Sequence, residues 1–317
     1  MREWFPHPPP PAILMYHRIA EESFDPWGGA ITPAHFRDHL SWLSQNRTVL
    51  PLIEFAELHR RGALPADAVA LTIDDGYACN SEVAAPLLEE FQIPATLFLP
   101  IGVLMSGRPF WWDELEDIVL EHEGPELTLD GGPVTLGEKS ATDRQWAPWS
   151  PPGTPRQAAY HDMHVQLART TPGRLVSVME DLRHQAKPVT EPAGLKRPMT
   201  REEVRRARNR FVEFGSHALN HPWLPDLDPA EQQHEICDSM EQCRELTGER
   251  PVAFAYPFGM FDEHSQQLAK EAGFACACTT RDRAVLRKSP MFALPRLPID
   301  NCDAAALEQS LAQARLS

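Results

Sequence analysis

The sequence predicts an α/β protein built on a parallel sheet, and two observations predict this class. Short apolar runs with strand character alternate, along most of the 317 residues, with segments that carry helix caps and helical apolar spacing. Such alternation is typical of β–α units, whose strands are parallel. In addition, several polar residues directly follow the apolar runs. The alternation is compatible with a closed barrel or with a doubly wound layer.

The predicted strands are 12–16, 69–73, 95–101, 211–215, 252–256, 274–279 and, as a last candidate, 292–299. The helices between them are expected to begin near Thr32, Leu52, Asn80, Thr200, Asp228 and Asp262. Some start signals are specific: Thr32 is followed by Pro33 at the first helical position, and Thr200 opens a capping box. Pro86 is expected to start, kink or shorten the helix near Asn80.

One long segment interrupts this alternation. It holds four of the eight tryptophans, several prolines and two helical patterns that are broken at residues 171–173. We interpret it as a mainly helical insertion in a single unit whose remaining length suits one α/β barrel. The predicted organisation is a barrel over 12–300, the insertion over 107–190, and terminal extensions over 1–11 and 301–317.

The tryptophans of the insertion have two interpretations. Trp112, Leu115 and Val119 follow helical spacing, which predicts a small apolar core within the insertion. Indole rings also offer flat faces on which a sugar ring can stack, so contact with a carbohydrate is the alternative. The spacing favours the core.

Composition limits the partners and the compartment. The net charge of −15 disfavours non-specific binding to nucleic acids or anionic membranes. No apolar run reaches the roughly 18 residues of a membrane span. Residues 1–8 run into prolines without the apolar region of a secretory signal, so we expect a cytoplasmic protein. The six cysteines form no Cys-x-x-Cys pair, and Cys276 and Cys278 are expected to be small core residues.

Two adjacent acids end the predicted strand 69–73. Asp74 and Asp75 repel each other, and burying either one costs several kcal/mol unless a cation or a donor compensates it. Gly76 then allows a sharp turn. A turn with an aspartate cap for the next helix is the simple interpretation of these residues. A second stretch of the sequence favours a functional interpretation of the two aspartates.

His217 and His221 lie four residues apart, directly after another predicted strand. At this spacing two imidazoles can point at one position, and two histidines with one carboxylate form a common catalytic metal site with places left for water. The two aspartates, His217, the turn at Pro257 and His17 all follow predicted strands. A barrel brings these strand ends together on one face.

The motifs resemble those of a known family. Residues 72–76, 217–221 and 255–259, in this order, are similar to the three main motifs of the polysaccharide deacetylase (NodB-homology, carbohydrate esterase family 4) family. Residues 15–18 resemble the first strand of a subgroup in which the last catalytic motif is moved to the N-terminus. The resemblance covers roughly residues 12–105 and 196–300 and implies a distorted (β/α) barrel with about seven strands.

The resemblance also implies a function. A family member of this kind is a metal-dependent hydrolase that removes acetyl groups from N-acetylated sugars of a polysaccharide or a glycan precursor. The cofactor is a divalent metal, with zinc favoured over cobalt or nickel, and the partner is a carbohydrate. The implied residues are the metal ligands Asp75, His217 and His221, the base Asp74, the acid His17, and the turn of Tyr256, Pro257 and Phe258, with the backbone N–H of Phe258 as oxyanion donor.

One position departs from the family pattern and keeps alternatives open. Many members carry an arginine that orients the base where this chain has Ala255, and Arg296 is the hypothetical substitute. Without such an arginine, the chain would be a non-catalytic carbohydrate-binding or scaffold protein on the same fold. A mononuclear iron oxygenase also uses two histidines and a carboxylate. It ranks last, because that class uses an antiparallel β scaffold and needs no second aspartate.

Overall fold

Parallel strands form the centre of the computed structural model, which describes residues 10–147, 149–186 and 194–314. The main path through the sheet has the strand order β11-β10-β9-β6-β5-β1-β12, and β4 pairs with β5 at its side. Every pairing in this sheet is parallel. The strands are β1 (Ala12–Tyr16), β4 (Thr48–Val49), β5 (Ala68–Ile73), β6 (Ala95–Leu99), β9 (Val212–Ser216), β10 (Ala253–Ala255), β11 (Cys276–Cys278) and β12 (Leu297–Pro298).

One short segment links the two ends of the sheet. Leu294 forms a parallel bridge with Cys278 at the end of β11. Three residues later, Leu297 pairs with Leu14 of β1. The curled sheet is therefore a distorted barrel, as the sequence predicts. The last predicted strand, 292–299, is realised only as this irregular link with the two residues of β12.

Helices cover the outside of the curled sheet. They are α1 (Pro33–Asn46), α2 (Leu52–Arg61), α3 (Ala85–Phe91), α4 (Ile101–Ser106), α8 (Arg201–Ala207), α9 (Pro229–Gln233), α10 (Ser239–Thr247), α11 (Glu263–Glu271) and α12 (Ala304–Gln313). The predicted caps are present, because the Thr32 side chain accepts from His35 N–H, and Thr200 forms its capping box with Glu203. The helix predicted near Asn80 starts as a π-helical turn over Asn80–Ala84. Its α-helical part, α3, begins at Ala85, one residue before Pro86.

The central strands β1, β5 and β6 are buried along their whole length. All six residues of β5 and all five of β1 are buried, as expected for a parallel sheet covered on both faces. Cys276 and Cys278 are likewise buried core residues. α12 packs against α1 although it lies in the predicted C-terminal extension 301–317. Residues 1–9, most of the predicted N-terminal extension, lie outside the described residues.

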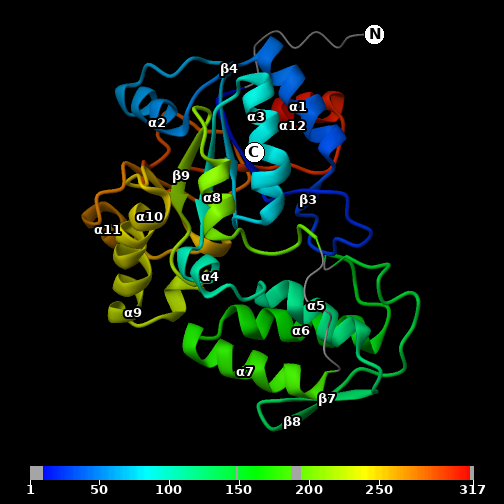
Figure 1. The fold of residues 1–317 in the computed structure, drawn as a ribbon. Coiled ribbons are helices and arrows are strands. Elements are labelled where there is room, and N and C mark those ends of the chain that lie inside the picture. Colours follow the sequence, from blue (N-terminus) through cyan, green and yellow to red (C-terminus); the bar gives the residue numbers. More distant parts are fainter. Residues whose placement is uncertain (1–9, 148, 187–193, 315–317) are drawn as a thin grey trace.

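The insertion forms a layer below the strand ends (Figure 1). It contains α5 (Trp111–Glu121), the hairpin of β7 (Glu126–Leu129) and β8 (Gly132–Thr135), α6 (Pro155–Ala168) and α7 (Pro172–Gln185). These elements share an apolar cluster in which Leu115 and Val119 are fully buried. Trp112 lies at the edge of that cluster. Residues 148 and 187–190 of the predicted insertion lie outside the described residues.

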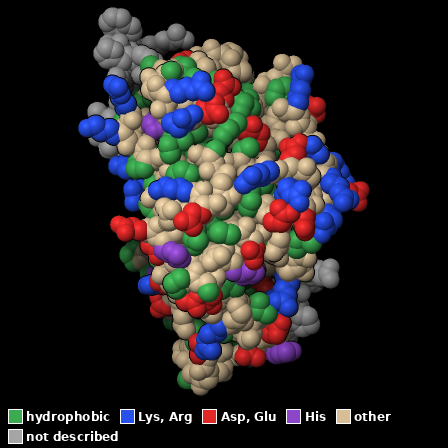
Figure 2. Space-filling model, turned by 90° about the vertical axis from the view of Figure 1, so that its left-hand side faces the viewer, with side chains coloured by type: hydrophobic (Ala, Val, Ile, Leu, Met, Phe, Trp, Pro, Cys, Tyr) green, Lys and Arg blue, Asp and Glu red, His purple; other side chains and the backbone are tan. Residues whose placement is uncertain are grey.

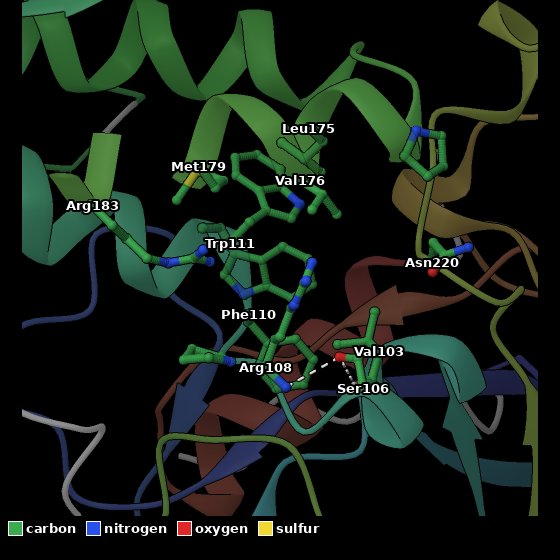
Figure 3. A pocket seen from close by; sticks show the side chains of 13 residues that line it. Val103, Ser106, Arg108, Phe110, Trp111, Leu175, Val176, Met179, Arg183 and Asn220 are labelled. Atoms are coloured by element: carbon green, nitrogen blue, oxygen red, sulfur yellow. Dashed lines mark hydrogen bonds between the residues drawn. The ribbon is translucent and has the colours of Figure 1, made fainter. Parts of the chain in front are cut away.

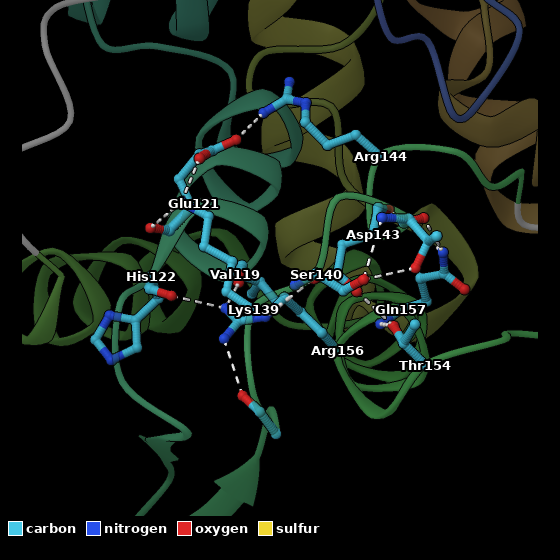
Figure 4. Close-up of polar contacts among 12 residues, drawn as sticks. Val119, Glu121, His122, Lys139, Ser140, Asp143, Arg144, Thr154, Arg156 and Gln157 are labelled. Atoms are coloured by element: carbon cyan, nitrogen blue, oxygen red, sulfur yellow. Dashed lines mark hydrogen bonds and ion pairs between the residues drawn. The ribbon is translucent and has the colours of Figure 1, made fainter.

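A fully buried arginine ties the insertion together. Arg156 donates to the carbonyl oxygens of Val119 (2.6 Å) and His122 (2.9 Å), and further to Gly124 and Gly137 (Figure 4). Its Nε lies 3.6 Å from an Asp143 oxygen. One side chain therefore satisfies carbonyl groups at the end of α5 and in two loops.

Figure 2 shows basic and acidic side chains interspersed on the face turned to the viewer. Among the described residues, no helix has the length and apolar character needed to cross a membrane.

Replacing Arg156 by Met should destabilise the protein. The change keeps much of the apolar volume but leaves buried carbonyl groups without their donor and the Asp143 carboxylate without its cationic neighbour, which costs about 3–5 kcal/mol. Urea unfolding measures the loss. The matched control is Arg174→Met, which removes an exposed arginine from its pair with Asp130 and should cost less than about 1 kcal/mol. Equal losses in the two variants would contradict the proposed role of Arg156.

Candidate metal centre and active site

The polar residues that follow the strands meet at one cavity. His17 follows β1, Asp74 and Asp75 follow β5, and His217 follows β9. The cavity has a volume of about 270 Å³. Its lining consists of His17, Arg18, Asp25, Pro26, Trp27, Gly29, Asp74, Asp75, Tyr77, Trp112, Asp113, Glu116, His164, His217, His221, Tyr256, Phe258 and Thr280.

Backbone strain is concentrated at this cavity. Among the described residues, six non-glycine positions have positive φ, and four of them belong to the site: Asp75 (φ 71°), Ala218 (61°), His221 (55°) and Phe258 (56°). A left-handed backbone costs residues with a side chain about 1–3 kcal/mol, and such positions persist where the surroundings enforce them. The strain aims the side chains of Asp75 and His221 into the cavity.

Three of these side chains can share one metal ion. The potential ligand atoms of Asp75, His217 and His221 all lie within 4.8 Å of one another. Asp75 Oδ1 is 3.7 Å from His217 Nε2 and 3.5 Å from His221 Nε2. An ion among them would have three protein ligands and space toward the cavity for further ones.

The histidines are prepared as neutral ligands. The Nδ1–H of His217 donates to the Ala255 carbonyl oxygen at 2.7 Å, because a carbonyl can only accept, and Nε2 is left with its lone pair. Burial lowers the pKa of His217 to about 4 and lowers the pKa of His221 well below its ordinary value. Both rings are therefore neutral near pH 7.

Asp75 is suited to bind the same metal ion. Burial, with the charges of Asp74 and Asp113 adding to it, raises the pKa of this carboxyl well above its ordinary value. Its Oδ1 atom is buried and has no hydrogen-bond partner, which is costly for a carboxylate. A divalent cation bound between Asp75 and the two histidines would compensate this charge. The donor set, one carboxylate and two imidazoles, suits zinc and its neighbours.

Asp74 is compensated differently, by Arg296. The guanidinium donates to both carboxylate oxygens, at 2.7 and 2.6 Å, and its Nε donates to the Thr279 carbonyl at 2.9 Å. Burial opposes the ionised form of Asp74, but Arg296, followed by His217 and His17, outweighs it and lowers the pKa to about 2. Arg296 thus lies behind Asp74, where the sequence hypothesis places the arginine missing at Ala255.

The loop between the two histidines is held from two sides. The buried Glu235 carboxylate accepts from the backbone N–H groups of Leu219 and Asn220, both at 2.9 Å, and from the Asn220 side chain. On the other side, the Val103 N–H of α4 donates to the Leu219 carbonyl. Gly102 permits this approach, since a Cβ there would lie 2.9 Å from that oxygen. No local sequence pattern marks Glu235 for this role.

The residues of the predicted oxyanion turn lie beside the triad. Tyr256 lines the cavity, but its hydroxyl donates to the Phe292 carbonyl at 3.1 Å. Pro257 and Phe258 form a 3₁₀ turn, and the Phe258 ring packs edge-on against His221 with 4.5 Å between ring centroids. His17 lines the same cavity, where burial lowers the pKa of its imidazole.

The insertion forms part of the cavity wall, which the sequence analysis does not foresee. The Trp112 ring lies 4.9 Å from the His221 ring, and its Nε1 donates to the Tyr77 hydroxyl at 2.8 Å. That hydroxyl donates to Asp113 at 2.8 Å. Further insertion residues in the lining are Glu116 and His164.

A second, apolar cavity lies where α4 and the start of α5 face α7 (Figure 3). Its volume is about 140 Å³, and its apolar lining includes Phe110, Trp111, Leu175, Val176 and Met179. Arg108 and Arg183 also line it, but they pair with Glu180 and Glu114 of the insertion. Trp112 belongs to the walls of both cavities.

Comparison with known proteins identifies the family. The polysaccharide deacetylase family model matches residues 61–123 and 182–277, half of the chain, and the chain belongs to this family. The matched segments include the candidate ligands Asp75, His217 and His221. His17 and Arg296 lie outside them.

Individual relatives agree with this assignment. YxkH of Bacillus subtilis (strain 168), whose name places it among polysaccharide deacetylases, is 27% identical over 289 residues, which are 90% of this chain and 70% of YxkH. The poly-β-1,6-N-acetyl-D-glucosamine N-deacetylase of Escherichia coli (strain K12) is 33% identical over 91 residues, 28% of this chain and 13% of that enzyme.

Solved structures share the fold. The deacetylase PplD of Streptococcus pyogenes, in complex with acetate, superposes with a TM-score of 0.62 at 18% identity over 96% of this chain and 99% of PplD. IcaB from Ammonifex degensii gives a TM-score of 0.60 at 16% identity over 96% of this chain and 98% of IcaB.

The candidate triad predicts metal binding that can be measured without turnover. Protein freed of metal should bind one equivalent of Zn²⁺ in isothermal titration calorimetry, while His217→Ala and Asp75→Asn should lose tight binding. His164→Ala is the matched control, because this histidine lines the same cavity outside the triad and its variant should bind as the wild type does. Tight binding by both triad variants would remove the assignment.

Proposed function

We propose that the chain is a metal-dependent hydrolase that removes acetyl groups from N-acetylated sugars of a polysaccharide or a glycan precursor. The observation that carries the proposal is the arrangement at the end of β5. Asp75 faces two histidine Nε2 atoms, and the neighbouring Asp74 is fixed by Arg296 with its Oδ2 3.9 Å from His217 Nε2. Family membership supports carbohydrate as the substrate.

Asp75, His217 and His221 would hold the metal. A divalent ion supplies a Lewis acid that polarises the amide carbonyl and lowers the pKa of water, and zinc is favoured, with cobalt and nickel tolerated by the same ligands. The neutral histidines and the uncompensated Asp75 oxygen support this set of ligands.

Asp74 would act as the base. Its pKa of about 2 keeps it ionised near neutral pH, and the two hydrogen bonds from Arg296 fix its orientation toward the triad. A weak base that is correctly placed can still take the proton of the attacking water as the carbonyl carbon is attacked. Arg296 would therefore be a positioning residue.

His17 would protonate the departing nitrogen. An amine leaves an sp³ carbon poorly unless it is protonated, and His17 is a titratable donor in the same cavity. Burial lowers the pKa of His17, so its protonated ring is a stronger acid but is the minor form near pH 7. We assign the backbone N–H of Phe258, in the strained turn after β10, as a donor to the tetrahedral oxyanion.

Two further observations bear on the substrate and on the alternative function. One relative is named for poly-β-1,6-N-acetyl-D-glucosamine, which supports N-acetylated hexosamine as the sugar. The alternative, a non-catalytic carbohydrate-binding or scaffold protein, is favoured only by the absence of an arginine at Ala255. Arg296 makes the contacts to Asp74 that such an arginine would supply, so the catalytic function is the better supported one.

Removal of metal should abolish the reaction. Incubation with a chelator, followed by its removal, should suppress acetate release from N-acetylglucosamine oligomers, and Zn²⁺ or Co²⁺ should restore it. Released acetate is measured with a coupled enzymatic assay. Protein treated in the same way and returned to Mg²⁺ alone is the control. Acetate release that responds to neither chelation nor metal would count decisively against the proposed function.

Arg296→Ala should lower kcat/KM by about 10²-fold or more, the usual contribution of a placed base. Without the guanidinium, burial dominates and the pKa of Asp74 rises. The base is then protonated over a wider range, so the acidic limb of the pH–rate profile should move to higher pH. Arg296→Lys should recover part of the activity. The proposed role of Arg296 requires both effects, and a folded Ala variant with wild-type kcat/KM would remove it.

A further inference from the structure

The candidate cavity is small for a glycan. Its volume of about 270 Å³ lies below the roughly 300–1,000 Å³ of typical ligand pockets. The metal triad and Asp74 belong to its wall, so the sugar that carries the reacting amide must occupy it. Any further sugar of an oligomer therefore lies outside the cavity, against its rim.

Trp27 lies on this rim in a fixed orientation. It belongs to the loop between β2 (Arg18–Ile19) and β3 (Ala30–Ile31) and lines the cavity. Its Nε1 donates to the Tyr160 hydroxyl of α6 at 2.8 Å, and its ring packs on His164 with 4.1 Å between ring centroids. Nevertheless, 39% of the residue is exposed.

Trp149 lies beside the same loop. It is 71% exposed, the largest exposed fraction among the large apolar residues of the described part. Its ring lies 3.3 Å from the place of a Cβ at Gly28, the residue after Trp27, where φ is +65° and a side chain would be strained. Single exposed apolar residues are normal, whereas large contiguous apolar patches mark interaction sites. Trp27 lines the cavity, and the ring of Trp149 lies beside the residue that follows Trp27, so the two exposed indoles are neighbours on the loop that contributes to the cavity wall.

The charges of the cavity limit what can bind there. Five carboxylates line it, from Asp25, Asp74, Asp75, Asp113 and Glu116. Asp74 is held by Arg296 and Asp75 is a candidate metal ligand, so the remaining carboxylates are the ones that can accept hydrogen bonds from sugar hydroxyls. Apart from histidines, its basic lining is Arg18, which already pairs with Asp25 at 2.6 Å and Glu22 at 3.4 Å. Apart from the candidate metal ion, the described lining offers no unpaired Lys or Arg side chain to the diphosphate of a sugar nucleotide, which would lie among these carboxylates.

We infer that Trp27 and Trp149 form an outer subsite for a neutral pyranose ring next to the reacting one, so that the substrate is an uncharged N-acetylated oligosaccharide or polysaccharide rather than a single sugar or a sugar nucleotide. The electron-rich face of an indole attracts the slightly positive C–H groups on the flat side of a sugar. This inference rests on the proposed function. To that function it adds the chain length and the charge of the substrate.

The apolar second cavity is the competing place for a neighbouring sugar (Figure 3). Its volume of about 140 Å³ is similar to that of an engineered cavity that stays dry and binds benzene. Its two arginines are engaged with glutamates. It therefore offers a sugar few free polar partners, and the exposed indoles are the better subsite.

The test compares substrates of different length. Acetate release is measured with N-acetylglucosamine, its dimer and tetramer, and its uridine diphosphate derivative. Wild-type kcat/KM should rise from monomer to tetramer and be lowest for the nucleotide. Trp27→Ala and Trp149→Ala should each reduce the ratio of tetramer to monomer kcat/KM by about 3- to 10-fold, mainly through KM, as expected for one aromatic contact. Trp27→Phe should retain most of the ratio.

The controls separate the possible failures. Leu286→Ala removes an exposed apolar side chain elsewhere and should keep the wild-type ratio. Equal kcat/KM for monomer and tetramer, or tryptophan variants that lower both in proportion, would overturn the subsite while the proposed function stands. A changed ratio in Val176→Ala, with none in the tryptophan variants, would move the subsite to the second cavity and equally overturn it. If no substrate yields acetate, the proposed function fails and the inference fails with it.

Discussion

The burial of two adjacent carboxylates at the end of β5 is the constraint on which the site depends. Asp74 is 1% exposed and Asp75 7%, so neither can rely on water for its charge. The chain resolves the problem in two ways. Asp74 receives a buried arginine, whereas Asp75 faces two neutral imidazoles that cannot neutralise it. The first solution gives an ionised, oriented carboxylate, and the second leaves a site that favours a cation.

The solution for Asp74 links the site to the closure of the barrel. Arg296 lies 222 residues from Asp74 in the sequence, in the irregular link between Leu294 and β12. The same link bridges β11 and pairs with β1, so the arginine reaches its place only when the sheet curls and its ends meet. A regular strand is not required there, because the guanidinium is fixed by Asp74, Thr72 and the Thr279 carbonyl. Folding and charge compensation therefore depend on each other.

The sequence predicts the parts of this arrangement that follow local rules. Apolar runs locate the strands, caps locate the helices, and polar residues at strand ends locate the site. Arg296 is a hypothesis there because nothing local links it to Asp74. Glu235, Asp113 and His164 are missed for the same reason: each acts through residues distant in sequence. The β7–β8 hairpin is missed although Asp130-Gly131, both with positive φ, is a typical hairpin signal.

The insertion packs a core of its own and also forms part of the cavity wall. Leu115 and Val119 point into its apolar cluster, while Trp112 and Asp113 on the same helix reach the cavity. The two interpretations of its tryptophans are thus not exclusive, because Trp111 is buried, Trp112 contacts His221, and Trp149 is exposed. The strand ends carry the groups that the proposed chemistry needs, and a separately packed layer supplies much of the wall. Such a division allows the wall to change while the candidate catalytic groups stay in place, because the insertion core does not include the strands that hold Asp74 and Asp75.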